Sequence, residues 1–289
     1  MRKQLVVAIF LLASLPAVAS MEEALRAFKK GDQAAAVKEL STLGDAGNMS
    51  AQIMLGALYS KGGAVARNDK LAALWFERAA NQGNAEAQYQ LGNLYENSQL
   101  PKDYKAAANW YQKAAQQGSA KAQARLGVFY AEGMGVNKNT NEALLWSGKA
   151  ALQGNLEAQF WLGLLYKLGD AIPQNDTLAR GWLTKAAAQG HPNALLLLAE
   201  MYKEGEGGPK DPILAHALNK LAIANNTDMM RNAIKMREDL VEQLSLGQLD
   251  TSNKLATELQ KPKNFSSALN AYITKAHQAP FRFFDRPNK

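Results

Sequence analysis

The sequence repeats itself at an interval of 35 or 36 residues. Glycine marks this interval at Gly47, Gly83, Gly118, Gly154 and Gly190, and Asn226 holds the next place. Three more series keep the spacing: small residues at Gly56, Gly92, Gly127, Gly163 and Ala199; tyrosines at Tyr59, Tyr95, Tyr130, Tyr166 and Tyr202; and tryptophans at Trp75, Trp110, Trp146 and Trp182, followed by Leu218. A period of this length is typical of stacked helical units. Since one unit cannot bury its apolar face alone, the chain must stack similar units.

Each copy contains two predicted helices joined by a turn. In the second copy they cover 84–96 and 104–116, because apolar residues recur there at helical spacing. We expect the Gly56 series to let two helix backbones approach closely, and Trp110 with its equivalents to be buried between neighbouring pairs. The predicted fold is therefore all-α: a right-handed α-solenoid of helix-turn-helix repeats.

One copy carries the fixed positions of a known repeat. They are Ala87-Gln88, Leu91-Gly92, Tyr95, Ala107, Trp110-Tyr111, Ala114-Ala115 and Gly118. This pattern resembles the consensus of Sel-1-like repeats, relatives of the tetratricopeptide repeat, and five copies over 48–226 fit it. The fifth departs, with Ala199 in place of glycine and Leu218 in place of tryptophan, as terminal copies often do. The resemblance implies a scaffold that binds other proteins, with roles associated with the cell envelope.

The flanks of the repeats are predicted to be caps. Residues 20–47 keep part of the register and should form an N-terminal capping helix pair. After Asn226 the register is lost, and the polar, amphipathic pattern predicts C-terminal capping helices over 227–262. Residues 263–289 should form a short helix and a flexible tail.

The first nineteen residues have the features of a signal peptide. Arg2 and Lys3 precede an apolar run, and Ala17 and Ala19 supply the small residues that signal peptidases require. The run is too short for a transmembrane anchor, so we predict cleavage after Ala19 and a periplasmic or secreted protein. The chain has no cysteine, which excludes disulfides and a lipid-modified cysteine at the amino terminus.

The net charge of +7 is spread along the chain without long basic runs. We therefore expect no nucleic-acid partner, because an exported protein rarely meets one and the charge forms no concentrated patch. A dispersed positive charge is compatible with acidic partners or with association with the cell wall.

Catalytic signals are weak. His191, His216 and His277 are scattered, and the sequence contains neither Ser-x-x-Lys nor Gly-x-Ser-x-Gly. His191 stands at a helix start, where a structural role is expected. The turn at 205–210 lacks the Lys-Ser/Thr ending of a phosphate loop. Near the starts of second helices, Asp69, Asp103 and Asp211 are expected to cap these helices. We predict no catalytic residue, no metal ligand and no cofactor.

The resemblance brings one enzymatic alternative. Some secreted, cysteine-rich Sel-1-like proteins are described as penicillin-binding or β-lactamase-like. Their paired cysteines are missing here, and no residue of this chain can be matched to a catalytic role. A hydrolase of that kind therefore stays an alternative, and so does a glycan-binding protein of the cell wall.

Positions of the first helix that vary between copies indicate a partner surface. Two such series lie three residues apart and so share one face: Met54, Gln90, Arg125, Trp161 and Leu197; and Ala57, Asn93, Val128, Leu164 and Glu200. We predict that a protein or peptide partner in the cell envelope binds a concave helical surface at Arg125, Val128, Trp161, Leu164 and Leu197. Alternatively, Trp161 packs beneath a loop or beneath the carboxy-terminal tail, which carries Phe281, Phe283 and Phe284.

Overall fold

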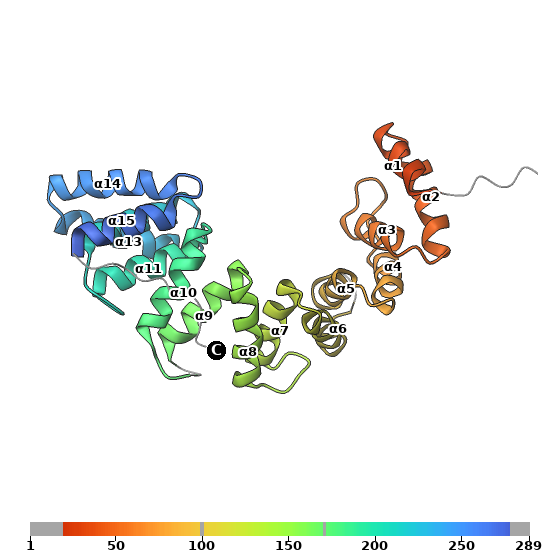
Figure 1. The fold of residues 1–289 in the computed structure, drawn as a ribbon, viewed down its shortest axis with the longest axis horizontal. Coiled ribbons are helices and arrows are strands. Elements are labelled where there is room, and N and C mark those ends of the chain that lie inside the picture. Colours follow the sequence, from red (N-terminus) through yellow and green to blue (C-terminus); the bar gives the residue numbers. More distant parts are fainter. Residues whose placement is uncertain (1–19, 99–100, 170–171, 278–289) are drawn as a thin grey trace, which may run out of the picture. The chain divides into compact units, whose positions relative to one another are not determined.

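The computed structural model describes residues 20–98, 101–169 and 172–277. Within these ranges the chain forms fifteen α-helices and no strand (Figure 1). The chain divides into two compact units, one ending at Asp103 and the other beginning at Tyr104. The predicted all-α solenoid is confirmed. The proposed signal peptide and the phenylalanines of the tail lie outside the described residues.

The first unit contains five helices, each packed against the next in sequence. They are α1 (Met21–Lys29), α2 (Gln33–Asp45), α3 (Met49–Lys61), α4 (Asp69–Asn81) and α5 (Ala85–Asn97). Ala24, Leu40 and Leu55 form its core together with Trp75. Helices α1 and α2 thus lie where the sequence predicts a capping pair, and they share a core with the first repeat.

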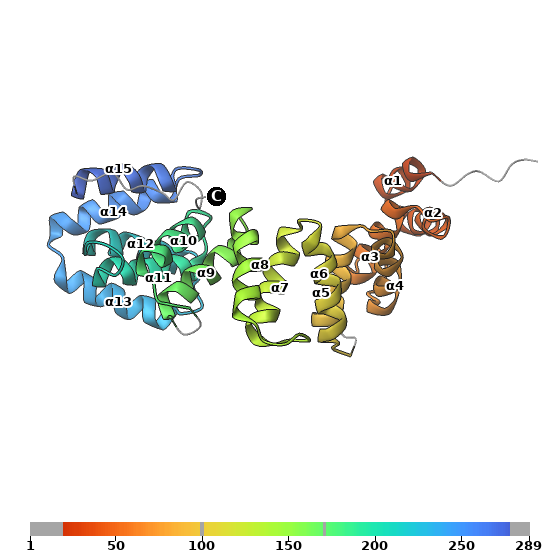
Figure 2. The same ribbon diagram turned by 60° about the horizontal axis from the view of Figure 1, so that its bottom comes forward.

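The second unit contains seven helices of the repeats. They are α6 (Tyr104–Gln116), α7 (Ala120–Glu132), α8 (Thr140–Leu152), α9 (Leu156–Leu168), α10 (Asp176–Ala188), α11 (Pro192–Glu204) and α12 (Pro212–Ala224). Three further helices follow: α13 (Met230–Gln243), α14 (Leu246–Gln260) and α15 (Phe265–His277). Helix α12 contacts both α13 and α14, and α15 packs on α14; Figure 2 shows α12 between α13 and α14.

The tyrosine series closes the turn inside each repeat through its backbone. The Tyr59 carbonyl accepts the N–H of Asn68 at 2.8 Å, and the Tyr202 carbonyl accepts that of Asp211 at 2.8 Å. Asn68 and Asp211 are also the N-caps of α4 and α12, so one hydrogen bond joins the end of the first helix to the start of the second. This bond fixes where the second helix begins.

The small-residue series allows close helix packing, as predicted. A Cβ added at Gly163 would lie 2.6 Å from Cγ of Leu183, and one added at Gly56 would lie 2.7 Å from Cδ1 of Phe76. Such distances are too short for a side chain without displacement of the neighbour. Glycine is therefore required at Gly56 and Gly163, where the first helix meets the second.

The tryptophan series is only partly buried, contrary to expectation for Trp110. Trp75 and Trp146 are buried, whereas Trp110 is half-buried and the Lys113 ammonium lies 4.0 Å from its ring centroid. The next residue, Tyr111, is fully enclosed. Successive helical residues point about 100° apart, so the position after tryptophan points into the core while tryptophan lies at its edge. The main buried aromatic residue of α6 is thus Tyr111.

A ladder of buried glutamines links successive repeats, and the sequence analysis missed it. In the first repeat, Gln52 donates to the Gly44 carbonyl at 2.8 Å and accepts from Gln82 at 2.7 Å. The same pairing joins Gln123 to Gln153 and Gln159 to Gln189. The first glutamine of each pair donates to a carbonyl in the last turn of the preceding helix, which also accepts the backbone N–H of the glycine three residues further on.

Candidate functional site

Two of the five predicted site residues meet on one surface. We use the term first-helix face for the outward side of α7, α9, α11 and α13. Val128 of α7 and Trp161 of α9 line a cavity of about 50 Å³ together with Leu165. The Trp161 side chain is 38% exposed, which is unusual for so large an apolar group. The cavity therefore offers an apolar recess with an indole at its rim.

Two other predicted residues contribute to the core instead. Leu197 is only 8% exposed and belongs to the core cluster that includes Met236 of α13. Leu164 is half-buried and packs against the same cluster. The inclusion of Leu197 in a partner surface is thus corrected, because the fifth repeat shares a core with the helices that follow it. The position of Leu197 within its repeat did not indicate that the helices after the repeats would cover it.

Arg125 lies on the same helix as Val128 but does not line the cavity. Its guanidinium carbon is 5.9 Å from the ring centroid of Phe129, and the side chain is half-buried. Leu165 of α9 lines the cavity, although the sequence analysis did not single it out and expected Arg125 on this surface instead. Leu165 lies one position beyond Leu164, so neither variable series includes it.

A charged groove of about 410 Å³ occupies the same face nearer the carboxy terminus. Lys167 of α9 pairs with Glu206, and Lys203 of α11 lies 3.4 Å from Asp239 of α13. Glu200 also lines this groove; burial raises the pKa of its carboxyl, and the nearby Lys167 ammonium opposes that rise. The first-helix face thus combines an apolar recess with a groove that carries both signs of charge.

Two of the three histidines have structural roles. His191 is the N-cap of α11, where Nδ1 accepts the N–H of Ala194 at 3.2 Å, and its ring stacks on Phe160 at 4.3 Å. His277 Nε2 lies 2.9 Å from a carboxylate oxygen of Asp211, the N-cap of α12. The structural role expected for His191 is confirmed.

The third histidine forms a pair that resembles a nucleophile and its base. His216 Nδ1 lies 2.7 Å from the Ser252 hydroxyl oxygen. The Ser252 side chain is fully buried, so its hydroxyl cannot reach a substrate. Among the described residues no carboxylate bonds to the His216 ring, as the third member of a triad would. The pair therefore does not form a hydrolytic site as it stands.

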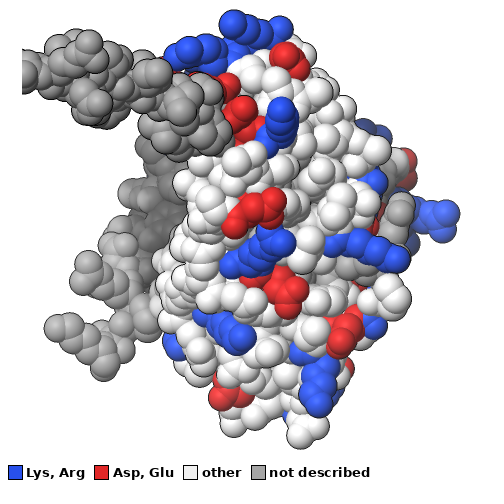
Figure 3. Space-filling model, turned by 90° about the vertical axis from the view of Figure 1, so that its right-hand side faces the viewer, with Lys and Arg blue, Asp and Glu red and all other residues white. Residues whose placement is uncertain are grey.

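Other binding chemistries find little support on this surface. Within residues 20–98, 101–169 and 172–277, no three His, Asp or Glu side chains are grouped as a metal site requires. No helix of the described part is long and apolar enough to cross a membrane. Positive and negative side chains are interspersed on the face of the first unit shown in Figure 3. That mixture is typical of a solvated protein surface.

Comparison with known proteins identifies the repeat. A family model described as Sel1 repeat matches five consecutive segments, residues 50–84, 85–119, 120–155, 156–191 and 192–226. A crystal structure of a Sel1 repeat protein from Oxalobacter formigenes is 30% identical, with 91% of this chain and 97% of that chain covered and a TM-score of 0.65. A protective antigen of uropathogenic Escherichia coli with an SLR fold is 24% identical, with 91% of this chain and 64% of that chain covered and a TM-score of 0.54. No curated protein matches the chain. The matched segments span more than half of the sequence, and the chain therefore belongs to the Sel1 repeat family.

Proposed function

We propose that this Sel1 repeat scaffold binds a protein or peptide through the first-helix face of its second unit. The observation that carries the proposal is the exposed Trp161 indole beside Val128, at the rim of an apolar recess. Tryptophan is enriched among the residues that dominate binding free energy, because it buries a large apolar area with few rotatable bonds. A partner that covers the indole would remove this apolar surface from water.

The charged groove supports the same proposal. An apolar side chain of the partner would enter the recess. Polar groups of the partner next to that side chain would meet Lys203, Glu204 and Lys235 in the groove. Charged groups at the edge of an interface fix orientation and speed association more than they increase affinity. The recess would therefore set affinity, and the groove would select the partner and its direction.

The test compares substitutions in the recess with one outside it. Trp161→Ala and Val128→Glu should each abolish capture of envelope proteins, whereas Leu145→Ala should not. Leu145 is a suitable control because, like Trp161, it is an exposed large apolar residue, but it lies on α8, a second helix. A photo-crosslinking side chain at position 128 should label the partner, and one at position 145 should not. Equal labelling from both positions in folded protein would contradict the proposal.

We also propose that the scaffold works after export. Ser20, the first residue expected after cleavage, is the N-cap of α1, and its hydroxyl accepts the N–H of Glu23 at 3.1 Å. Cleavage after Ala19 would leave that helix and its cap intact. Amino-terminal sequencing of the protein from the periplasm should begin at Ser20, and an intact Met1 would refute the prediction.

Glycan binding remains the second candidate, because the exposed Trp161 ring could stack on a sugar. Sedimentation with purified peptidoglycan separates the two functions. Retention that depends on Trp161 without any crosslinked protein would favour the glycan. Hydrolysis of a chromogenic β-lactam by the purified protein would instead favour the hydrolase alternative.

A further inference from the structure

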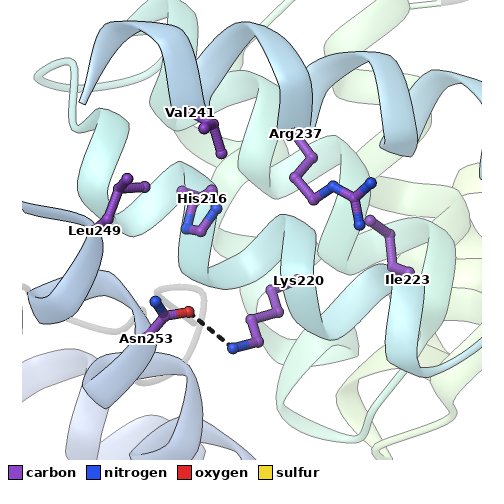
Figure 4. Close-up of a pocket in the computed structure, with 7 residues that line it drawn as sticks. All are labelled: His216, Lys220, Ile223, Arg237, Val241, Leu249 and Asn253. Carbon is purple, nitrogen blue, oxygen red and sulfur yellow. Dashed lines mark hydrogen bonds between the residues drawn. The ribbon is translucent and has the colours of Figure 1, made fainter. Parts of the chain in front are cut away.

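We propose that the groove between α12, α13 and α14 binds a small amphipathic carboxylate. The groove encloses about 320 Å³, at the small end of the range of ligand pockets. Figure 4 shows His216 at its centre, with Arg237 and Val241 on one side and Leu249 and Asn253 on the other. It shares α13 with the first-helix face but none of the residues that line the recess or the charged groove.

The groove exists because α13 and α14 do not pair as the repeat helices do. Only Leu244 and Ser245 join them, and both have extended backbone. A capping box at Ser245 and Gln248 starts α14 at once. Each of the two helices instead packs on α12. The surface of α12 at His216 and Lys220 consequently forms the floor of an open groove.

The polar lining of the groove supplies cations and hydrogen-bond donors. No acidic residue is among the groove's lining residues. Lys220 donates to the Asn253 side-chain oxygen at 2.8 Å, and Arg237 forms no ion pair within the described part of the chain. An uncompensated guanidinium next to an ammonium attracts an anion, and both cations make strong hydrogen bonds to carboxylates.

His216 adds a further donor at the floor. With its Nδ1 bonded to Ser252, the Nε2 atom has no hydrogen-bond partner among the described residues. Burial, together with the charges of Lys220 and Arg237, lowers the pKa of His216 and favours the neutral ring. If the Ser252 hydroxyl donates to Nδ1, the proton of the neutral ring is on Nε2, which then donates to a ligand oxygen.

The apolar lining determines the rest of the ligand. Ile223, Leu249 and the 44% exposed Val241 line the groove next to the cations. An inorganic anion would leave these side chains exposed to water, whereas a carboxylate with a short branched alkyl group would cover them. This chemistry occurs in free short-chain acids and in the last residue of a peptide with an apolar side chain.

Binding can be followed through the His216 ring resonances of the full chain, assigned with His216→Gln. We expect 4-methylpentanoate, or an acetylated dipeptide that ends in leucine, to shift these resonances, and the corresponding amides to leave them unchanged. Tighter binding of the dipeptide identifies a peptide carboxyl terminus as the ligand, and tighter binding of the free acid identifies a small metabolite. Equal binding of acids and amides, or no shift with any of the four, would overturn the proposal.

Two substitutions locate the site. Lys220→Gln and Arg237→Gln should each weaken carboxylate binding about tenfold, the factor expected for one lost charge-assisted hydrogen bond. Arg231→Gln is the matched control, because Arg231 is an exposed arginine of α13 that does not line the groove. Circular dichroism establishes that each variant is folded. If folded Lys220→Gln and Arg237→Gln proteins bind as tightly as the control, the carboxylate binds elsewhere.

Discussion

Helices α11 and α12 are joined by residues 205–211, whereas α13 and α14 are joined by only Leu244 and Ser245. The longer connection contains glycines at positive φ and is closed by the hydrogen bond between Tyr202 and Asp211. It lets the chain reverse, so that the two helices pair side by side. The short extended connection gives no such reversal, and α13 and α14 each pack on α12 instead.

The repeats and the carboxy-terminal helices are also held together by partly different contacts. In the repeats, glycine on one helix meets a bulky residue on the other, as Gly163 meets Leu183. At the carboxy-terminal end, α15 places Leu269 and Ile273 in the apolar core and adds polar contacts: Tyr272 donates to Asp211 at 3.1 Å, and His277 bonds to the same carboxylate. Apolar contacts therefore hold both regions, and α15 adds part-buried hydrogen bonds to a carboxylate, which depend more strongly on pH.

The largest expected effect concerns the core of the repeats. Tyr111→Ala should lower the free energy of unfolding by about 3–5 kcal/mol, since Tyr111 is fully buried and its ring packs edge-on against Phe129 at 5.3 Å. Trp110→Ala should cost less, because the Trp110 ring is half-buried. Denaturant unfolding of both variants measures the difference. A larger loss for Trp110→Ala would show that tryptophan, and not its neighbour, carries the repeat core.

The next effect concerns the carboxy-terminal end at alkaline pH. Burial raises the pKa of Tyr202 from 10.0 to about 12, and burial next to Asp211 also raises that of Tyr272. An acid with a raised pKa in the folded state stabilises the fold while it is protonated, so this stability is present below about pH 10. It is lost as the pH rises toward 12, by up to about 3 kcal/mol for Tyr202.

Tyr202→Phe tests that pH dependence. Its hydroxyl has no hydrogen-bond partner among the described residues, so the variant should unfold like the wild type near neutral pH. Between about pH 10 and 12 it should lose less stability than the wild type. If the free energy of unfolding falls equally for the two proteins over this pH range, the Tyr202 hydroxyl is not buried.

A smaller effect contrasts glycines in the two regions. Gly163→Ala should destabilise the protein by about 1–3 kcal/mol, because its new methyl group would collide with Leu183. Gly247→Ala in α14 should instead stabilise it, by up to about 1 kcal/mol, because no atom lies within 4 Å of the added Cβ. Thermal unfolding of the two variants should give shifts of opposite sign, and stabilisation by Gly163→Ala would show that this position does not need glycine for packing.

The smallest effect lies at the junction of the two regions. The pKa of Glu200 is raised, so its charged form opposes folding, and stability falls as the pH rises from the ordinary glutamate pKa to the raised value. Glu200→Gln should therefore be slightly more stable than the wild type near pH 7, and this gain should shrink near pH 4. Denaturant unfolding of both proteins at pH 4 and pH 7 measures this gain, and an equal gain at both pH values would contradict the burial of the Glu200 carboxyl.

Part of the candidate site followed from the sequence, and part did not. The series three residues apart correctly put Val128 and Trp161 on one surface, because helical geometry alone decides which side chains share a face. The same rule included Leu197, which is buried. The sequence did contain the glutamine ladder as a periodic series, but its role required knowledge of which carbonyls end each preceding helix.

The amino-acid sequence by itself determined the repeat, the two helices of each copy and the need for glycine between them. These features depend on contacts within one unit or between adjacent units, which a periodic sequence specifies locally. Only the tertiary structure decided that Tyr111 rather than Trp110 is enclosed, that Leu197 is covered, and that α12 forms the floor of a groove. The exposure of Leu197 and of the α12 surface depends on where the helices that follow the repeats pack, and beyond Asn226 no periodicity specifies that packing.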